Sequence, residues 1–294
     1  MTDAAATLLA QAEVAMALAE ISEGTTPSQD LLDALEIDRN EGEAICALLV
    51  GELPPFASIY LSSDGNIGGE AQAEIAGFYS AISVPPPPNP DYLSSMLYLL
   101  GQIIGKEAEF DDREEPKAKA IEIAKLTLVR WHLVPWLVPY LLRAEQITQG
   151  ATSTWSGLTF DLISSILERS KITSQGHSEW YTEAKDEAIE LFANSDDFVS
   201  WVTTPRLSGV ILAPSDLSKI ASSLGLAARV GRKRFTLEGL IQQSSREVLS
   251  ALAKFCASQC DLYTLNSQYA EVLEHWKNRA ARTKGRILAT IEAQ

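Results

Sequence analysis

The sequence predicts an all-α protein. Apolar residues recur at a spacing of three to four along most of the chain, whereas the alternation typical of a β-strand is almost absent. Capping residues and helix breakers separate these apolar stretches. The chain has 294 residues, which is long enough to bury a full core in one or two domains. We expect a helical bundle over residues 1–195 and a helical extension over residues 196–294 that packs on it.

Four helices and one ordered loop are predicted before residue 83. The second helix begins with Thr26 as its cap, Pro27 at the first position and Gln29 completing a capping box. The loop Leu53–Leu61 contains two prolines and leads into a Ser-Asp-Gly-Asn turn, so we expect no helix there, and it displays Phe56, Ile59 and Tyr60. The other three helices are expected at Ala4–Ile21, Glu41–Val50 and Gly69–Ile82.

A stiff run of four prolines, Pro85–Pro88, precedes the next predicted helix. Asn89 is expected to cap that helix, with Pro90 at its first position and Asp91 in its opening turn, where the helix dipole favours an acid. The remaining features of this part are a helix end near Glu107, an acidic loop over Glu107–Glu115, and a new helix from Pro116.

The most apolar stretch of the chain is Leu126–Ala144, which reads LTLVRWHLVPWLVPYLLRA. Pro135 has no N–H to donate to the carbonyl four residues earlier, so the stretch predicts two helices that meet at a kink near Pro135. His132 and Trp136 lie at that kink, next to a freed carbonyl group. His132 has two interpretations: it is a buried structural histidine in a kinked core helix, or it is part of a functional site. The residues alone favour the structural histidine.

The remainder of the chain also predicts helices. A polar loop is expected at Gln146–Ser153 and a boundary at Asn194–Asp197. The predicted helices are Gly157–Ile172, Glu179–Ala193, Asp216–Leu224, Thr236–Tyr263 and Asn266–Ala293.

The formal net charge of −15 is unevenly distributed. Residues 1–116 contain 21 acidic and three basic residues, whereas residues 117–294 contain 18 acidic and 21 basic residues. An acidic N-terminal part repels nucleic acid and attracts a basic partner. A solvated, solubilising surface is the alternative interpretation.

The cysteines and histidines do not predict a metal site. Three Cys and three His are scattered without zinc-ligand spacing, and Cys256 and Cys260 share one helical face with apolar residues, so we interpret them as core thiols. Such sparse cysteines fit a reducing compartment. No cofactor is expected.

No targeting or membrane-spanning segment is predicted either. The N-terminus lacks a basic region, Glu13 and Glu20 interrupt its apolar residues, and uncharged runs such as Tyr92–Gly105 are too short to cross a bilayer. We therefore expect a cytoplasmic protein without stable membrane insertion, and either a monomer or a dimer.

Sequence patterns give little support to an enzyme or to a DNA-binding protein. The chain has no glycine-rich phosphate loop and no defensible Ser/His/Asp or Cys/His set. Residues 216–234 have the pattern of a helix and a turn followed by Arg232, Lys233 and Arg234. The apolar Leu226 and Val230, however, are unsuited to hydrogen bonding with base edges. A helical adaptor or DNA-binding regulator that uses this segment stays as the alternative function, and no nucleic acid is expected as partner.

Three separated stretches, in this order, resemble the TorD-like redox-enzyme maturation chaperones, which include the dimethyl sulfoxide and nitrate reductase assembly chaperones. Pro54–Leu61 (PPFASIYL) is similar to the family's Pro-Pro-aromatic-x-Ser-Val-Tyr-Leu loop. Pro90–Leu93 (PDYL) is similar to its Pro-x-Asp-His segment, and Trp131–Trp136 (WHLVPW) is similar to its His-Leu-x-Pro-Trp signature. The resemblance covers roughly residues 5–195.

This resemblance implies an all-helical, cofactor-free chaperone that is not an enzyme. Such proteins bind the twin-arginine leader of a molybdopterin-dependent oxidoreductase, or the enzyme precursor itself, until the cofactor is inserted. Tyr92 stands where the family has His beside the Asp, so the nucleotide binding reported for that acid–histidine pair is not carried over. The implied client-binding residues are Pro55, Phe56, Ser58, Tyr60, Asp91, Tyr92, His132, Pro135 and Trp136.

Overall fold

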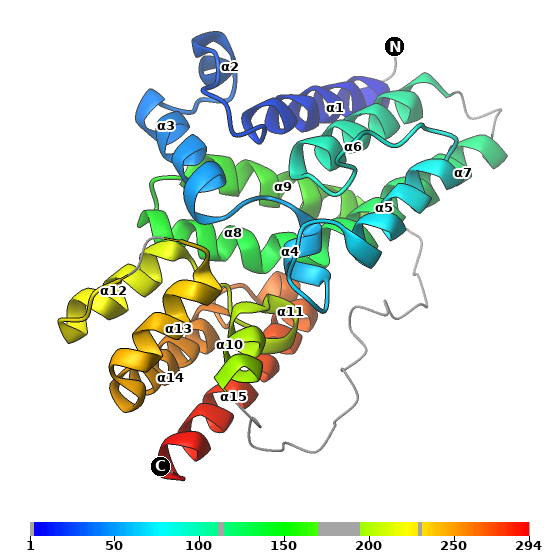
Figure 1. Ribbon diagram of the computed structural model, residues 1–294. Coiled ribbons are helices and arrows are strands. Elements are labelled where there is room, and N and C mark those ends of the chain that lie inside the picture. The colour runs from blue at the N-terminus through cyan, green and yellow to red at the C-terminus, as the bar shows by residue number, and fades with distance from the viewer. Residues whose placement is uncertain (1–2, 111–114, 170–194, 229–230, 294) are drawn as a thin grey trace. The chain divides into compact units, whose positions relative to one another are not determined.

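Helices form nearly all of the regular structure in the computed structural model, which confirms the predicted all-α class (Figure 1). No strand is found among the residues that the structure describes, and an isolated antiparallel bridge joins Phe56 to Tyr92. The described residues are 3–110, 115–169, 195–228 and 231–293.

The chain divides into two compact units, and the division does not follow chain order. The first unit comprises Met1–Ser58 and Ile67–Gly176. The second comprises Ile59–Asn66 and His177–Gln294, so it includes a short segment from the N-terminal part of the chain.

The first unit is a helical assembly organised around α6. Helix α1 lies along α6 (Figure 1), and its residues Ala15, Leu18 and Ile21 are buried. Gly101 permits this close approach, because a Cβ atom there would lie 2.8 Å from Met16 Cγ and 3.0 Å from the Ala12 carbonyl oxygen. The elements are α1 (Asp3–Ile21), α2 (Gln29–Ala34), α3 (Arg39–Ala47), η1 (Leu48–Glu52), α4 (Ala57–Leu61, which continues into the second unit), α5 (Gly69–Ala81), α6 (Leu93–Glu109), α7 (Glu115–Thr127), η3 (Leu128–Leu133), α8 (Val134–Thr148) and α9 (Ser153–Arg169).

Two elements of the first unit, η1 and η3, are π-helical turns. The N–H of Leu53 donates to the carbonyl of Leu48 at 2.8 Å, five residues earlier, at the end of η1. Segment η3 separates α7 from α8, and Pro135 lies in the first turn of α8, where the missing N–H breaks no helical bond. The predicted junction of two helices near Pro135 is therefore confirmed, and the junction itself is a π-helical turn.

The second unit consists of short helices and one long helical pair. Helices α14 and α15 lie side by side (Figure 1). Gly209 adopts a left-handed conformation (φ 70°) and touches α15 so closely that a Cβ atom would lie 2.4 Å from the Ala280 nitrogen. The elements are α10 (Ser195–Thr203), α11 (Pro205–Ser208), α12 (Pro214–Leu224), α13 (Lys233–Gln243), α14 (Ser245–Leu262), η4 (Ser267–Tyr269) and α15 (Ala270–Glu292).

Several predicted helix starts are wrong by a few residues, and the true caps explain why. Ser28, not Thr26, caps α2, because its hydroxyl accepts a hydrogen bond from the N–H of Leu31. Asp38 caps α3 in the same way, so α3 begins before Glu41.

The predicted helix-free loop Leu53–Leu61 is also wrong in its second half, which forms α4. The two prolines precede α4 rather than interrupt it, and a carboxylate from a distant part of the chain caps its first turn, as described below. Tyr60 is buried rather than displayed, and Phe56 and Ile59 are only partly exposed.

Other boundaries differ for similar local reasons. Helix α6 begins at Leu93, so Asp91 precedes it instead of occupying its first turn. Helix α8 continues to Thr148, into the predicted loop. The predicted helix Thr236–Tyr263 is two helices separated at Ser244, whose hydroxyl bonds the Glu247 carboxylate.

Some predictions lie outside the described residues, namely the helix Glu179–Ala193, the end of the helix predicted to run to Ile172, and residues 111–114 of the predicted acidic loop. One described helix, over Ala4–Ile21 in α1, is long and apolar enough to cross a membrane by length and composition. It nonetheless includes Glu13 and Glu20, and one face of it is buried within the first unit.

Candidate functional site

The first two sequence stretches meet directly in the first unit. The N–H of Leu93 donates to the Pro55 carbonyl at 2.9 Å, and the N–H of Ala57 donates to the Asp91 carbonyl at 2.9 Å. The rings of Phe56 and Tyr92 stack at a centroid distance of 4.7 Å. This short antiparallel bridge therefore fixes the start of α4 against the start of α6.

Asp91 is the polar centre of this junction. Its side chain is fully buried and accepts hydrogen bonds from the Ser58 hydroxyl at 2.5 Å, the Ser58 N–H at 3.2 Å and the Gln72 amide at 2.9 Å. Ser58 lies in the first turn of α4, so Asp91 caps that helix from 33 residues away. The Ser58 hydroxyl also accepts from the N–H of Gly68 at 3.1 Å, which fixes the residues before α5.

Tyr92 is held in place by a separate contact. Its hydroxyl donates to the Glu23 carbonyl at 2.9 Å. Burial, with smaller contributions from the nearby Glu23 and Cys46, raises the pKa of the Tyr92 phenol, so this hydroxyl stays protonated as a donor. The residue that replaces the family's histidine thus anchors the end of α1 to the start of α6.

The third stretch reaches the first through Tyr140. The Tyr140 hydroxyl donates to the Leu53 carbonyl at 2.8 Å, and its ring packs edge-on against Trp136. The Trp136 indole N–H donates to the His132 carbonyl at 2.9 Å. Trp136 thus bonds the carbonyl of His132, whereas the carbonyl four residues before Pro135 is that of Trp131.

His132 lies in an apolar environment. Its ring is 5.0 Å from the ring of Phe78, and Nδ1 has no hydrogen-bond partner among the described residues. Burial lowers the pKa of His132 to about 4, because the charged imidazolium would lose its hydration. The imidazole is therefore neutral at physiological pH.

Most of the sequence-predicted site residues are buried. Phe56 and Tyr92 are the two that are partly exposed. The buried ones are Pro55, Ser58, Tyr60, Asp91, His132, Pro135 and Trp136. In this structure, these seven side chains are not available for direct contact with a partner.

Two hollows on the first unit are accessible to a partner, and sequence reasoning did not single them out. The first has a volume of about 880 Å³ and lies between α1, the polyproline segment and α6. Its lining includes Glu13, Glu20 and Glu23 but no Lys, Arg or His. Met16 and Tyr98, which is 52% exposed, add apolar surface beside these carboxylates.

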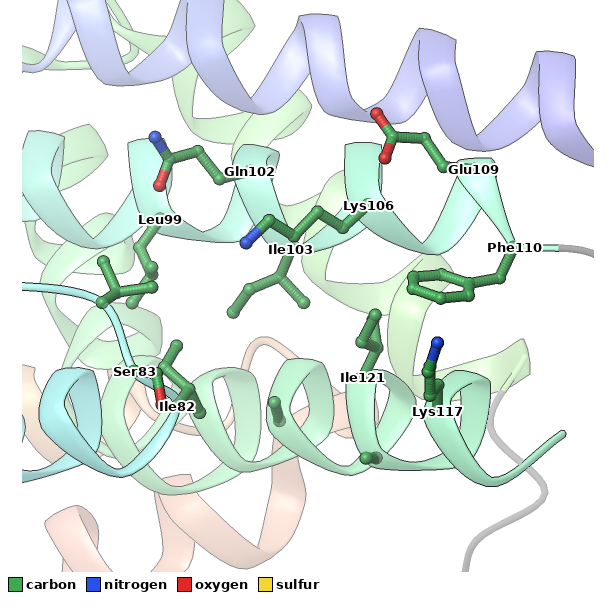
Figure 2. A pocket seen from close by; sticks show the side chains of 13 residues that line it. Ile82, Ser83, Leu99, Gln102, Ile103, Lys106, Glu109, Phe110, Lys117 and Ile121 are labelled. Carbon is green, nitrogen blue, oxygen red and sulfur yellow. The ribbon is translucent and has the colours of Figure 1, made fainter. Parts of the chain in front are cut away.

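The second hollow has a volume of about 720 Å³ and lies between α6 and α7 (Figure 2). Figure 2 shows Ile103 of α6 and Ile121 of α7 pointing toward each other, with Ile82 near one end of the hollow and Phe110 near the other. Lys106, Glu109 and Lys117 are its charged residues. Both volumes are in the range of small-molecule or peptide side-chain sites.

Signals for these hollows exist in the sequence but are weak. Tyr98 is an exposed aromatic residue on the side of α6 that otherwise carries Ser94, Ser95 and Gln102, and the acids of α1 recur at residues 13, 20 and 23 on or beside one helix. In the sequence alone, neither pattern can be distinguished from an ordinary solvated surface, because the sequence does not show which helices pack beside α1 and α6.

Other candidate chemistries gain no support from the described residues. No group of three or more His, Cys, Asp or Glu side chains that could hold a metal ion occurs there. Cys256 is buried, which raises the pKa of its thiol to about 12. Helix α12 ends at Leu224 and α13 begins at Lys233, a longer connection than the three- to four-residue turn of a helix-turn-helix motif.

Comparison with known proteins gives one family match. Residues 9–140 match the family model described as "Nitrate reductase delta subunit". This range contains all three sequence stretches and all the lining residues of both hollows. No curated protein and no solved structure matches the chain.

Proposed function

Because residues 9–140 make this chain a member of the nitrate reductase delta subunit family, we propose that it binds a molybdopterin-dependent oxidoreductase. This family consists of chaperones for molybdoenzyme maturation. The bound part of the client is its leader peptide or its apo form. The chain binds this client in the cytoplasm, before cofactor insertion and export or assembly. It holds no cofactor of its own and catalyses no reaction.

The charge of the N-terminal part supports a leader as client. A twin-arginine leader has a basic segment followed by an apolar segment. Residues 1–116 contain 21 acidic and three basic residues, so this part of the chain attracts the basic segment. The accessible apolar side chains of the first unit provide surface for the apolar segment.

Order-of-magnitude energies agree with a releasable complex. Burial of three or four Leu-sized side chains contributes about 1.5–3 kcal/mol each. Ordering a flexible peptide costs roughly 2–5 kcal/mol or more, and each exposed ion pair adds only about 0.2–1 kcal/mol. The balance favours micromolar affinity, which allows the client to leave once it is mature.

The nine signature residues remain our proposed client-binding region. Because seven of them are buried, we propose that they act mainly by fixing the junction of α4, α5 and α6, while Phe56 and Tyr92 are those that reach a client. The observation that carries the proposed function is the family match over the residues that contain all three stretches.

Co-purification tests the class of client. The tagged full-length protein is isolated from its native cytoplasm, and bound proteins are identified by mass spectrometry. A molybdopterin oxidoreductase that still carries its leader is the expected result. Its absence, with nucleic acid or an unrelated protein in its place, would contradict the proposal.

A substitution tests the proposed binding region. Phe56→Ala is expected to weaken leader binding while the helical circular dichroism stays unchanged. Phe235→Ala serves as the control, because Phe235 is 48% exposed and belongs to the second unit. Equal affinities of Phe56→Ala and the wild type would show that the binding region is misplaced.

A further inference from the structure

We infer that the two hollows along α6 form one continuous peptide-binding groove of defined polarity: its α1 end binds the basic part of a client segment, and its α6–α7 end binds the adjoining apolar part. This inference rests on the proposed function. It adds a second contact region on the same unit, apart from Phe56 and Tyr92, and the direction in which the segment lies there.

The two hollows adjoin each other, because three residues line both. Val84, Leu99 and Gln102 line both of them. Leu99 is buried and forms part of the floor, whereas Gln102 and Val84 are partly exposed at the junction. An extended segment that leaves one hollow over these residues enters the other.

The groove has opposite electrostatic character at its two ends. The α1 end includes three exposed glutamates, Glu13, Glu20 and Glu23, and no basic residue. The α6–α7 end includes Lys106, Lys117 and Glu109, so its lining has one excess positive charge. A basic segment is attracted to the first end and disfavoured at the second.

The α6–α7 end is better suited to apolar side chains. Ile82, Ile103, Phe110 and Ile121 line it, and Figure 2 shows the Lys106 side chain extending among them. Small residues of α7, Ala120 and Ala124, leave room for an occupant. Side chains of Leu or Phe size that enter this space lose water-exposed apolar surface, which favours binding.

Charge complementarity selects the occupant among the alternatives. A second copy of the first unit is a poor partner, since the sequence of that unit has ten basic side chains against 24 acidic ones. An anionic lipid surface is repelled by the same three glutamates at the α1 end. A peptide whose basic residues adjoin an apolar run matches both ends at once.

The first experiment measures affinity for a synthetic peptide with an Arg pair followed by a run of Leu and Ala. The full-length variant E13Q/E20Q/E23Q is expected to bind about tenfold more weakly than the wild type at low ionic strength, with a smaller difference at high ionic strength. The control E36Q/E70Q/D161N removes the same charge from exposed positions of the same unit that line neither hollow, and it is expected to bind like the wild type. Equal loss in both triple variants would overturn the inference, because net charge alone would then explain binding.

The second experiment fills the apolar end. Ala120 is exposed on α7, so Ala120→Trp keeps the fold and places its indole in the hollow. The expected result is at least a tenfold loss of peptide affinity, whereas Ile123→Trp, at an exposed position on α7 outside the lining, binds normally. If Ala120→Trp instead changes the oligomeric state and leaves peptide affinity unchanged, the groove is a self-association surface and the inference is wrong.

Photo-crosslinking tests the direction in which the peptide lies in the groove. It also distinguishes a failure of this inference from a failure of the proposed leader recognition. A crosslinker at the basic end of the peptide is expected to label residues 13–23, and one at the apolar end is expected to label residues 117–124. Labelling in the opposite order, or labelling only around Phe56 and Tyr92, would overturn this inference while leaving leader binding intact. No binding of the peptide by the wild type would contradict the proposed leader recognition itself.

Discussion

At the scale of single residues, the first unit uses buried carboxylates as internal helix caps. Asp91 caps α4, and Glu41, which is 8% exposed, accepts a hydrogen bond from the N–H of Trp155 in the first turn of α9 at 2.9 Å. Both partners lie far away in the chain, so the spacing rules that identify local caps do not find them. Some of the acidic residues that suggest a charged surface in the sequence therefore hold helices together.

Asp91→Ala is expected to lower the free energy of unfolding by about 3 kcal/mol, because hydrogen bonds to a charged group contribute about 1.5–3 kcal/mol and their buried donors would lose a partner. Urea denaturation of the full chain measures this. Asp91→Asn keeps one acceptor oxygen and should cost less, about 1–2 kcal/mol. Unfolding midpoints that coincide for the wild type and Asp91→Ala would refute the capping role.

His132 predicts a pH dependence of stability. Its pKa is about 4 in the folded chain and about 6.5 when the chain unfolds, so the unfolded state binds more protons between these values. The neutral imidazole is compatible with the fold above pH 6.5, and stability falls as the pH decreases from 6.5 to 4. The expected loss is about 3 kcal/mol.

Denaturation series at neutral pH and near pH 4 measure this effect, with His132→Gln as the reference. The variant is expected to lose about 3 kcal/mol less than the wild type over the same interval. A wild type and a variant with parallel pH profiles would show that His132 does not titrate in this range.

At the scale of elements, helix identity can be predicted well and helix ends cannot. Periodic apolar spacing gives the positions of α1, α5, α6 and α15 to within a few residues, because burial of one face determines each helix. Helix α4 is missed, since its five residues depend on Asp91 for a cap and on the rest of the fold for burial. The break at Ser244 is also missed, because no Pro or Gly marks it.

The contact between Gly209 and α15 gives an element-scale prediction. Gly209→Ala places a methyl group 2.4 Å from the Ala280 nitrogen at a positive φ, so we expect a loss of about 3 kcal/mol or more in unfolding free energy. Gly225→Ala is the matched control, because its φ is 66° but a Cβ atom there meets nothing within 4 Å. The control should cost only about 1 kcal/mol.

Thermal denaturation of both variants distinguishes the steric cost from the backbone cost. A Gly209→Ala protein that melts together with Gly225→Ala would mean that α15 shifts to accommodate the methyl group.

At the scale of the whole molecule, the second unit includes Ile59–Asn66 from the N-terminal part of the chain. The Arg206 guanidinium donates to the Leu61 carbonyl at 2.9 Å, and Gly65 lies against Thr204. A division near residue 195 is what the Asn-Ser-Asp-Asp sequence at residues 194–197 suggests. The exchanged segment has no such signature, because its membership in a unit depends on tertiary contacts alone.

Cleavage of the chain tests this interlocking. A protease site inserted between Gly176 and His177 and then cut should leave two fragments that co-elute in size-exclusion chromatography, because Ile59–Asn66 stays packed within the second unit. The fragments should separate in urea. Arg206→Ala should make them separate more readily, and separation without denaturant in the parent protein would refute the interlocking.

The candidate site shows the same division between what a sequence can and cannot predict. The three stretches resemble the family whose model matches residues 9–140, and the first two meet in the structure, since motif residues that fix a junction must be close together. Their burial, and the groove along α6, depend on how α1 and α7 lie beside α6. Exposed residues such as Tyr98 and Glu20 carry no periodic signal that distinguishes a groove wall from ordinary surface.

The π-helical turn Leu128–Leu133 constrains how this sequence can evolve. A π-turn contains one more residue than the α-helical turn it replaces. Deletion of a single residue there would restore α-helical geometry and rotate all that follows by about 100° relative to α7. Trp136 and Tyr140 would then leave the core, and the Tyr140 bond to Leu53 would be lost. The number of residues between α7 and Trp136 must therefore stay constant.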